Sequence, residues 1–334
     1  MPGIQAILWR SGWALLVTLA LTPILRDIFR VYQIVDRPGL RKVHEYPIPR
    51  LGGIALAAAF ALGLIGLHAG GLAGRILPAA ALMVLTGVVD DFFNLPAVVK
   101  LFGQVAAACV AYWAGLRVPE PAAISFPVTV FWLVLASNAF NLVDGLDGLC
   151  AGLGCASAGA MFLLALVRDD VPLEAGSLIL AGALLGFLFH NFSRATMFLG
   201  DSGALLIGFL LGCYGVMWTE QTGASLSMLA PLLVIGVPVT EVCLSVLRRR
   251  VAGRPIFSAD QGHMHHRLME RGFSSREAVL MLYAWGAGGG VFAFLLVFPS
   301  LRAWRAWIIA LFLVFILAGV RELRYSEFKW RRTG

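Results

Sequence analysis

The residues best suited to chemistry in this chain are carboxylates that stand at the ends of apolar segments. Asp90 and Asp91 close one apolar run in VVDDFFNLP, and Asp201 precedes another in FLGDSGALLIGF. Two adjacent carboxylates at a membrane edge repel each other and need cations or protons nearby. Asp201 could cap the helix that follows, or it could join the amides of a helix N-terminus in a phosphate site. Both interpretations of Asp201 stay open at this point.

A second group of polar residues forms a stripe of amides and acids. Asn138, Asn141, Asp144 and Asp147 follow one another at intervals of three residues. Residues three apart lie on the same face of a helix, so we expect neighbouring pairs to share a face. Such a stripe is costly in lipid unless it lines a cavity, and a polar seam between packed helices is the alternative. Asp and Asn oxygens suit Mg²⁺, with Mn²⁺ as the other candidate ion.

The third group is a cluster of histidines. Three of the six histidines fall within four residues, in His263-Met264-His265-His266, and Arg267 follows directly. This composition predicts a cationic, hydrogen-bonding patch suited to a pyrophosphate. A zinc site is disfavoured because no cysteine stands nearby and because adjacent histidines are awkward ligands of one ion. A solvated basic loop is the remaining alternative.

The elements that must position these residues are membrane helices. Of the 334 residues, 59% are hydrophobic and only 13% are charged, against roughly 25% charged in soluble domains. Apolar runs recur along almost the whole length, which predicts an all-α polytopic membrane protein. A soluble enzyme, a disordered chain and a secreted disulfide scaffold are excluded.

The apolar runs predict about eleven transmembrane helices. A run of about 20 residues crosses the bilayer as a helix. The expected spans lie near residues 4–25, 51–69, 76–89, 97–114, 126–143, 149–167, 175–191, 203–218, 226–247, 279–298 and 306–320.

Lysine and arginine predict the orientation of these spans. If the segments between spans alternate from 26–50 onward, one side carries most of the 26 Lys and Arg residues. Short loops rich in these residues stay in the cytoplasm, so the N-terminus is expected outside and the C-terminus inside. The net charge of +7 is then explained by topology and by anionic lipid headgroups, without any role for nucleic acid.

All three polar groups fall on the predicted cytoplasmic side. We expect residues 1–320 to form one transmembrane catalytic domain, followed by a basic cytoplasmic tail at 321–334. The loops expected to form the active site are 26–50, 90–96, 144–148, 192–202 and 248–278. One face then combines metal ligands, a basic loop and a membrane. Phosphoryl transfer with a divalent metal, from a water-soluble substrate to a lipid, uses these parts.

Several ordered motifs resemble one family, the polyprenyl-phosphate N-acetylhexosamine-1-phosphate transferases of glycosyltransferase family 4. These bacterial enzymes start the assembly of cell-envelope glycans. The resemblance extends from about Asp36 to Arg267 and to the eleven-span plan. The matching segments are DRPGLRKVHEYPIPRLGG at 36–53, Asp90–Asp91, Lys100-x-x-x-Gln104, NAFNLVDGLDGL at 138–149, FLGDSG at 198–203 and the histidine loop at 257–268.

The resemblance implies a reaction and a set of roles. A sugar 1-phosphate moves from a UDP-sugar to undecaprenyl or another polyprenyl phosphate, and UMP is released. Asp201 and Asn141 are implied as Mg²⁺ ligands. Asp90 and Asp91 are implied as an acidic pair, one of which acts on the lipid phosphate, and Lys100 as a phosphate-binding lysine.

Further implied residues complete the site. Asp144 and Asp147 fall where the family has important acids. The segment that holds the sugar and pyrophosphate in this family corresponds to the histidine loop, so the expected substrate-binding residues are His263, His265, His266 and Arg267. The implied location is the bacterial inner membrane, with the active site on the cytoplasmic face, and a homodimer is compatible with this plan.

The histidine loop also bears on the sugar donor. The branch that acts on UDP-N-acetylmuramoyl-pentapeptide has three consecutive histidines, whereas this loop resembles the N-acetylglucosamine branch. Because Met264 cannot replace a histidine's hydrogen bond, we expect the muramoyl donor to be rejected. Glu241 stands where relatives often have Asp, and it is either part of the sugar pocket or a buried acid with a partner.

Three rival functions are weighed against this expectation. The muramoyl-pentapeptide branch differs only in its donor. A CDP-alcohol phosphotransferase is disfavoured because no arginine follows Asp144-Gly145 at the place that its signature requires. A transporter of phosphorylated sugars is disfavoured because transporter sites lie near the midplane of the membrane on broken helices, whereas the acids of this chain cluster at the ends of spans on one face.

Overall fold

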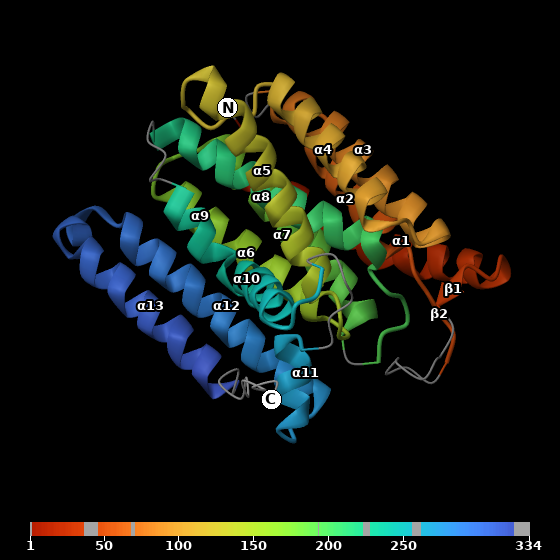
Figure 1. Cartoon of the computed structure of the whole chain (residues 1–334). Coiled ribbons are helices and arrows are strands. Elements are labelled where there is room, and N and C mark those ends of the chain that lie inside the picture. Colours follow the sequence, from red (N-terminus) through yellow and green to blue (C-terminus); the bar gives the residue numbers. More distant parts are fainter. Residues whose placement is uncertain are drawn as a thin grey trace, which may run out of the picture.

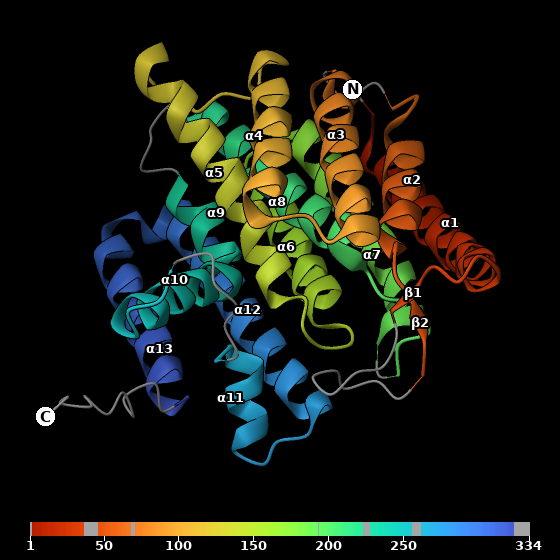
Figure 2. The ribbon, with the colours of Figure 1, turned by 45° about the vertical axis from the view of Figure 1, so that its right-hand side comes forward.

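The computed structural model describes residues 2–36, 46–67, 71–192, 194–222, 228–255 and 262–323. These residues form a helical bundle with one two-stranded antiparallel sheet (Figures 1 and 2). The strands are β1 (Val35–Asp36) and β2 (Ile48–Pro49). The helices are α1 (Ile4–Val31), α2 (Gly52–Leu64), α3 (Leu72–Phe93), α4 (Ala97–Trp113), α5 (Ala122–Val143), α6 (Leu149–Leu166), α7 (Val171–Asn191), α8 (Gly200–Thr222), α9 (Leu229–Val234), α10 (Gly236–Val251), α11 (Met264–Glu270), α12 (Ser275–Val297), the 3-10 helix η2 (Pro299–Trp304) and α13 (Arg305–Glu322).

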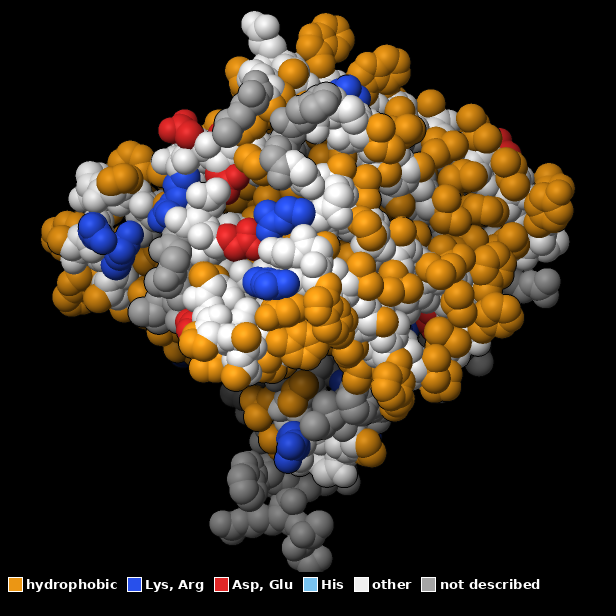
Figure 3. All heavy atoms as spheres, turned by 90° about the horizontal axis from the view of Figure 1, so that it is seen from above, with side chains coloured by type: hydrophobic (Ala, Val, Ile, Leu, Met, Phe, Trp, Pro, Cys, Tyr) orange, Lys and Arg blue, Asp and Glu red, His pale blue; other side chains and the backbone are white. Residues whose placement is uncertain are grey.

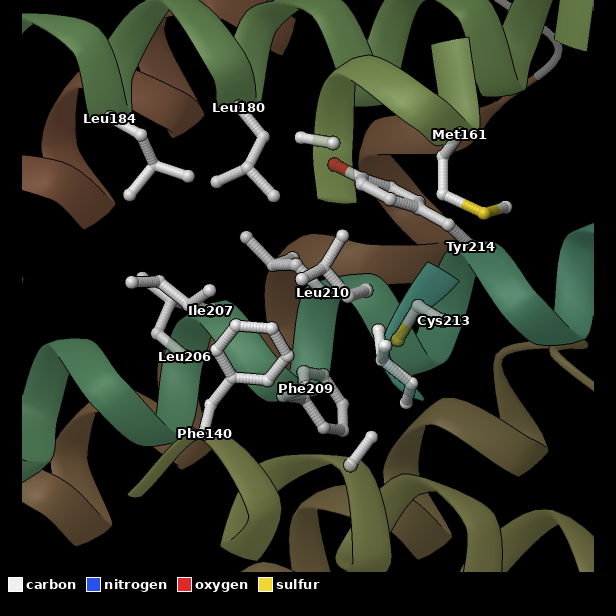
Figure 4. Packing of buried hydrophobic residues seen from close by; sticks show 14 of the residues in the cluster. Phe140, Met161, Leu180, Leu184, Leu206, Ile207, Phe209, Leu210, Cys213 and Tyr214 are labelled. Carbon is white, nitrogen blue, oxygen red and sulfur yellow. The ribbon is translucent and has the colours of Figure 1, made fainter. Parts of the chain in front are cut away.

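Helix α8 forms the centre of the bundle. Its apolar length is buried, and α2, α3, α5, α6 and α7 all pack against it. Figure 4 shows Phe140 of α5 and Leu180 of α7 on either side of its side chains. A Cβ at Gly208 would lie 2.3 Å from the carbonyl oxygen of Ala136, so only glycine permits this contact with α5. A small residue at this position therefore lets the two helices pack closely.

Seven helices among the described residues are long and apolar enough to cross a membrane. This bears out an all-helical polytopic membrane protein, because a bilayer needs about 20 residues per helical span. Two shorter apolar helices, α2 and α4, correspond to the expected spans 51–69 and 97–114. The total of eleven spans and the orientation of the ends stay predictions.

The expected span 226–247 is interrupted in the structure. Helix α9 ends at Val234, and α10 begins at Gly236 and continues to Val251. Pro238 lacks a backbone N–H, so it cannot donate to the carbonyl of Val234 and a continuous helix is disfavoured. After the break, Glu241 of α10 contacts Met264 at the start of α11, the helix that carries His265 and His266.

The second strand, β2, belongs to the motif at 36–53, and this motif contacts the segment just before α8. The backbone N–H of Phe198 donates to the carbonyl of Pro49 at 2.8 Å, and Gly52 donates to the carbonyl of Phe198 at 3.0 Å. The hairpin and α11 both lie in the lower half of Figure 2. Residues 37–45 and 256–261 and most of the predicted tail lie outside the described residues.

One face of the molecule is largely apolar. Seen from the top of Figure 1, where the N-terminus lies, the molecule has a broad apolar area, and acidic and basic side chains gather on one part of it (Figure 3). A broad apolar surface is what helices that face lipid require.

Candidate active site

Asp91 joins the end of α3 to the beginning of α8. Its Oδ1 accepts the backbone N–H of Asp201 at 2.9 Å, and its Oδ2 accepts that of Ser202 at 3.1 Å. The first N–H groups of a helix have no partner within the helix, so a carboxylate from another helix stabilises them. Gly200 has φ +72° and no room for a side chain beside Asp91, which explains the glycine in GDSG. Asp91 therefore positions α8, including Asp201.

Lys100 of α4 connects the other two acids. Its Nζ forms ion pairs with Oδ2 of Asp90 and with Oδ2 of Asp201. Asp90 also accepts the backbone N–H of Leu95 through Oδ1 at 2.7 Å. The Nδ2 group of Asn141 donates to Oδ1 of Asp201 at 2.9 Å. Asp201 thus acts through its side chain in a cluster with α4 and α5, and the cap of α8 is supplied by Asp91.

The predicted stripe divides into two parts. Asn138 pairs with Gln104 of α4, and its Nδ2 also donates to the carbonyl of Val134 at 2.8 Å, so it belongs to a polar seam between helices. The shared helix face was predicted to continue to Asp147, which is wrong because α5 ends at Val143. Asp144 and Asp147 instead stand in the turn before α6, where glycines allow the chain to change direction.

Asp147 holds the segment that precedes α8. Its Oδ2 accepts the backbone N–H of Ala195 at 2.8 Å. Asp144 has a different environment, because no described residue donates a hydrogen bond to its carboxylate. Burial, followed by the negative charges of Asp201, Asp91 and Asp147, raises the pKa of Asp144 to about 8. Negative charge at this point is therefore incompletely balanced by the protein.

The histidine cluster lies against the same turn. A Cβ at Gly145 would lie 2.5 Å from Cε1 of His265, so glycine permits the turn to contact this ring. The ring centroids of His265 and His266 are 4.2 Å apart, and those of His263 and His265 are 5.6 Å apart. Burial and then the charges of His266 and His263 lower the pKa of His265 to about 3. His265 is consequently neutral near pH 7.

One cavity of about 690 Å³ joins these groups. Segments far apart in the sequence contribute to its wall, and most of the predicted site residues are among them. The predicted residues that line it are Asp91, Asn141, Asp144, Asp147, Asp201, His263, His265 and His266. Asp90 and Lys100 stand behind this lining and contact it through Asp201. Arg267 does not line it and lies beside Glu270, with Nη1 3.5 Å from Oε2.

Three arginines of the cavity wall were not singled out from the sequence. Arg50, Arg194 and Arg276 come from the segment after β2, the segment before α8 and the first turn of α12. Arg50 lies inside the motif at 36–53, which is a signal for it, but nothing in the sequence near Arg194 or Arg276 distinguishes them from other basic residues. Their charges suit a phosphorylated substrate in the cavity.

The acids of this cavity fit a magnesium ion. Asp201, Asn141 and Asp144 supply oxygen atoms at one wall. No three His, Cys, Asp or Glu side chains among the described residues are placed to hold a metal by themselves. Mg²⁺ commonly uses one or two carboxylates and completes its shell with water and substrate phosphates. These residues are therefore suited to an ion that binds together with a phosphorylated substrate.

Comparisons with known proteins match this part of the molecule. The family model described as glycosyl transferase family 4 matches residues 74–219, from α3 to the end of α8. A Bacillus subtilis protein is 33% identical over 317 residues, which cover 91% of this chain and 87% of the relative. Its name is "Probable undecaprenyl-phosphate N-acetylglucosaminyl 1-phosphate transferase".

Relatives from other bacteria have similar names. The decaprenyl-phosphate N-acetylglucosaminephosphotransferase of Mycolicibacterium smegmatis is 37% identical, covering 81% of this chain and 77% of the relative. The undecaprenyl-phosphate alpha-N-acetylglucosaminyl 1-phosphate transferase of Escherichia coli K12 is 29% identical, covering 77% and 75%. The extent of the Bacillus match, together with the family model over the carboxylate-bearing helices, shows that this chain belongs to glycosyl transferase family 4.

Proposed function

We propose that this protein transfers N-acetylglucosamine 1-phosphate from UDP-N-acetylglucosamine to undecaprenyl phosphate or a similar polyprenyl phosphate, and releases UMP. The observation that carries the proposal is the single cavity in which Asp144 and Asp201 face the histidine cluster. Carboxylates for a metal and donors for a pyrophosphate are thereby close enough to act on one substrate. The names of the relatives support the choice of sugar and acceptor lipid.

The reaction is an exchange at the phosphorus that carries the sugar. An oxygen of the lipid phosphate attacks this phosphorus, and the bond to the oxygen that bridges the two phosphorus atoms breaks, so UMP leaves. The bond between the sugar and its oxygen stays intact. A phosphate monoester is largely ionised near neutral pH, since its second pKa is about 6. Removal of a proton is therefore less important than positioning, and Asp90 need not be a general base.

The residues of the site divide this work among them. Asp201, Asn141 and Asp144 would hold Mg²⁺, whose contribution is to neutralise charge on phosphate oxygens. Lys100 keeps Asp90 and Asp201 in place and adds a positive charge close to the acids. The histidines and the arginines of the wall donate to the donor's phosphates. Asp91 and Asp147 hold the backbone from which these groups project.

The donor preference depends on the relatives more than on the methionine of the histidine loop. Met264 is 3% exposed and lines a separate apolar pocket with Trp285 and Phe315. Its side chain therefore removes no hydrogen-bond donor from the main cavity, which corrects the physical reason offered from the sequence. We still expect UDP-N-acetylglucosamine to be used and the muramoyl-pentapeptide donor to be rejected, on the strength of the relatives' names.

The proposal includes the membrane arrangement. Residues 1–320 would form one catalytic domain in the bacterial inner membrane with about eleven spans, the N-terminus outside and the cavity open to the cytoplasm. Two facts support it. Most Lys and Arg residues belong to the segments that the sequence predicts to be cytoplasmic, and the cavity-lining acids other than Asp36 lie at helix ends or in the adjoining turns.

Purified protein tests the reaction directly. It is incubated with polyprenyl phosphate, Mg²⁺ and a panel of UDP-sugars, and both UMP and UDP are measured. We expect UMP with UDP-N-acetylglucosamine and no turnover in EDTA. UDP as the nucleotide product, or full activity in EDTA, contradicts the proposal. Efficient use of the muramoyl-pentapeptide donor would move the protein to the other branch, and sugar flux across vesicles without lipid product would favour a transporter.

A further inference from the structure

Glu241 has an environment that the reaction so far leaves unexplained. It stands on α10, and its side chain is buried, with 1% of the residue exposed. Within α10, its Oε1 accepts a hydrogen bond from Nη2 of Arg248 at 2.9 Å and from Oγ of Ser245 at 3.1 Å. A buried carboxylate with a charged partner is costly to place, and it persists where it has several donors. Glu241 therefore is the buried acid with a partner that the sequence left as one alternative.

The same carboxylate extends to the histidine cluster. Nδ1 of His263 lies 3.0 Å from Oε1 of Glu241, and the backbone N–H of Met264 donates to Oε2 at 2.7 Å. Both contacts are made at the point where α11 begins. One side chain of α10 thus holds a side chain and a backbone group of the segment that lines the cavity.

The contact determines which nitrogen of His263 is available. A carboxylate accepts hydrogen bonds, so the proton of this pair lies on Nδ1, and Nε2 is left for the cavity that His263 lines. When Nε2 also carries a proton and donates to an anion, the negative charge of Glu241 balances the imidazolium. His265 differs, because its surroundings keep it neutral.

We propose that Glu241 is a positioning residue for the nucleotide-sugar donor. By holding Nδ1 of His263 and the N–H of Met264, it presents Nε2 of His263 to a phosphate of the donor. The inference rests on the proposed function, and it assigns Glu241 to donor binding with no contact of its own to either substrate.

The first test is Glu241→Gln in the full-length protein. Glutamine keeps the volume but has one acceptor oxygen, so it cannot accept from both Met264 and His263. We expect KM for UDP-N-acetylglucosamine to rise about tenfold or more. KM for polyprenyl phosphate should stay within about twofold of wild type, and kcat should change less than the donor KM. A purely structural defect would instead lower the active fraction and leave both KM values unchanged.

The matched control is Glu220→Gln at the far end of α8. Glu220 also accepts from an arginine and from a backbone N–H, but it is remote from the cavity. The donor KM of Glu220→Gln should equal that of wild type. A second variant, Glu241→Gln with Arg248→Met, avoids leaving a buried positive charge without its carboxylate. This double variant should show the same rise in the KM for the donor. It replaces Glu241→Gln in the test if the single variant folds poorly.

A double-mutant cycle with His263→Ala shows whether Glu241 acts through His263. We expect Glu241→Gln to add little to the loss caused by His263→Ala, because the shared partner is already gone. Binding of UDP-N-acetylglucosamine without acceptor lipid, measured by calorimetry, gives the same comparison for variants with slow turnover. His263→Asn, whose amide can replace Nδ1 but not Nε2, should bind the donor as weakly as His263→Ala.

Two results overturn the inference. One is a donor KM and affinity within about twofold of wild type in both Glu241→Gln proteins, and the other is full additivity with His263→Ala. Either result leaves the proposed function standing, provided that wild-type protein releases UMP from UDP-N-acetylglucosamine. Wild-type protein that neither binds nor consumes this donor contradicts the proposed function itself, and the inference with it.

Discussion

The two ends of the α3–α8 pair differ in charge balance: one end has a matched ion pair, and the other has more carboxylates than cations. At the start of α3, Arg75 pairs with Glu220 near the end of α8, and Nη2 lies 2.7 Å from each carboxylate oxygen. Nη2 also donates to the carbonyl of Gly115 at 2.8 Å, and Glu220 accepts the backbone N–H of Arg117. At the end of α3, Asp90 and Asp201 of the same two helices share a single lysine, Lys100, while Asp91 accepts backbone N–H groups of α8.

The difference separates stability from chemistry within one helix pair. The Arg75–Glu220 end has matched charges that satisfy one another, so its contribution is to hold α3, α8 and the loop after α4 together. The Asp90–Asp201 end has surplus negative charge beside a cavity of about 690 Å³, where a cation and a phosphorylated substrate can complete it. Substitutions at the Arg75–Glu220 end should consequently lower stability, whereas substitutions at the Asp90–Asp201 end should lower activity.

The largest expected effect on activity is that of Asp201→Asn. This change removes the carboxylate that contacts Lys100 and Asn141 at the cavity. We expect UMP release to fall about a thousandfold or more, since metal-assisted charge stabilisation is worth several kcal/mol. Thermal unfolding in detergent should show a folded protein. Near-wild-type turnover would mean that Asp201 only supports its helix, because Asn serves as well as Asp at a helix start.

Substitution of the adjacent acids Asp90 and Asp91 should affect turnover and Tm to different extents. In Asp91→Asn, one of the two backbone N–H groups of α8 loses its acceptor, at a cost of about 1–3 kcal/mol. We expect both lower turnover and a lower Tm. Asp90→Asn breaks an ion pair with Lys100 and should reduce turnover by about a hundredfold with a smaller change in Tm. Equal and negligible effects of the two substitutions would remove the pair from the mechanism.

The cavity end should also make stability depend on pH. The pKa of His265 is about 3 in the folded protein and 6.5 when unperturbed, so below pH 6.5 the unfolded chain binds a proton that the folded chain does not. The contribution of His265 to stability is therefore full above pH 6.5 and falls toward pH 3, by at most about 1.4 kcal/mol per pH unit. Because Asp144, with its raised pKa, acts in the opposite direction in both proteins, the comparison is between them: from pH 7 to pH 4.5, Tm of wild type should decrease relative to Tm of His265→Gln. Parallel slopes contradict this.

The smallest effect on activity should come from Glu220→Gln. Both side chains of the Arg75–Glu220 pair are about a quarter exposed, at 29% and 26%, and the pair lies far from the cavity. We expect Tm to fall by a few degrees, for a loss of about 1 kcal/mol, while UMP release stays unchanged. A clear drop in turnover by the protein that is still folded would show that the two ends are coupled and would break the comparison.

Much of the helical plan could be predicted from the sequence. Hydropathy is a property of consecutive residues, and seven expected spans became helices long enough to cross a membrane. The motifs around Asp90, Asn141 and Asp201 predicted which segments meet, and the structure brings these three residues into one cluster. Lys100 joins Asp90 to Asp201, and Asn141 donates to Asp201. The matching relatives confirmed the family that the motifs indicated.

The sequence by itself determined the membrane class, the main helices and the family, because segment length, hydropathy and motif order are properties of consecutive residues. Only the tertiary structure decided that Asp91 caps α8, that Met264 points away from the main cavity and that Arg276 lines it. Each of these outcomes depends on the packing of segments that are distant in the chain; Asp91 and Asp201, for example, are separated by 110 positions. Local patterns carry no information on such contacts, since a side chain's partner is set by how whole helices pack.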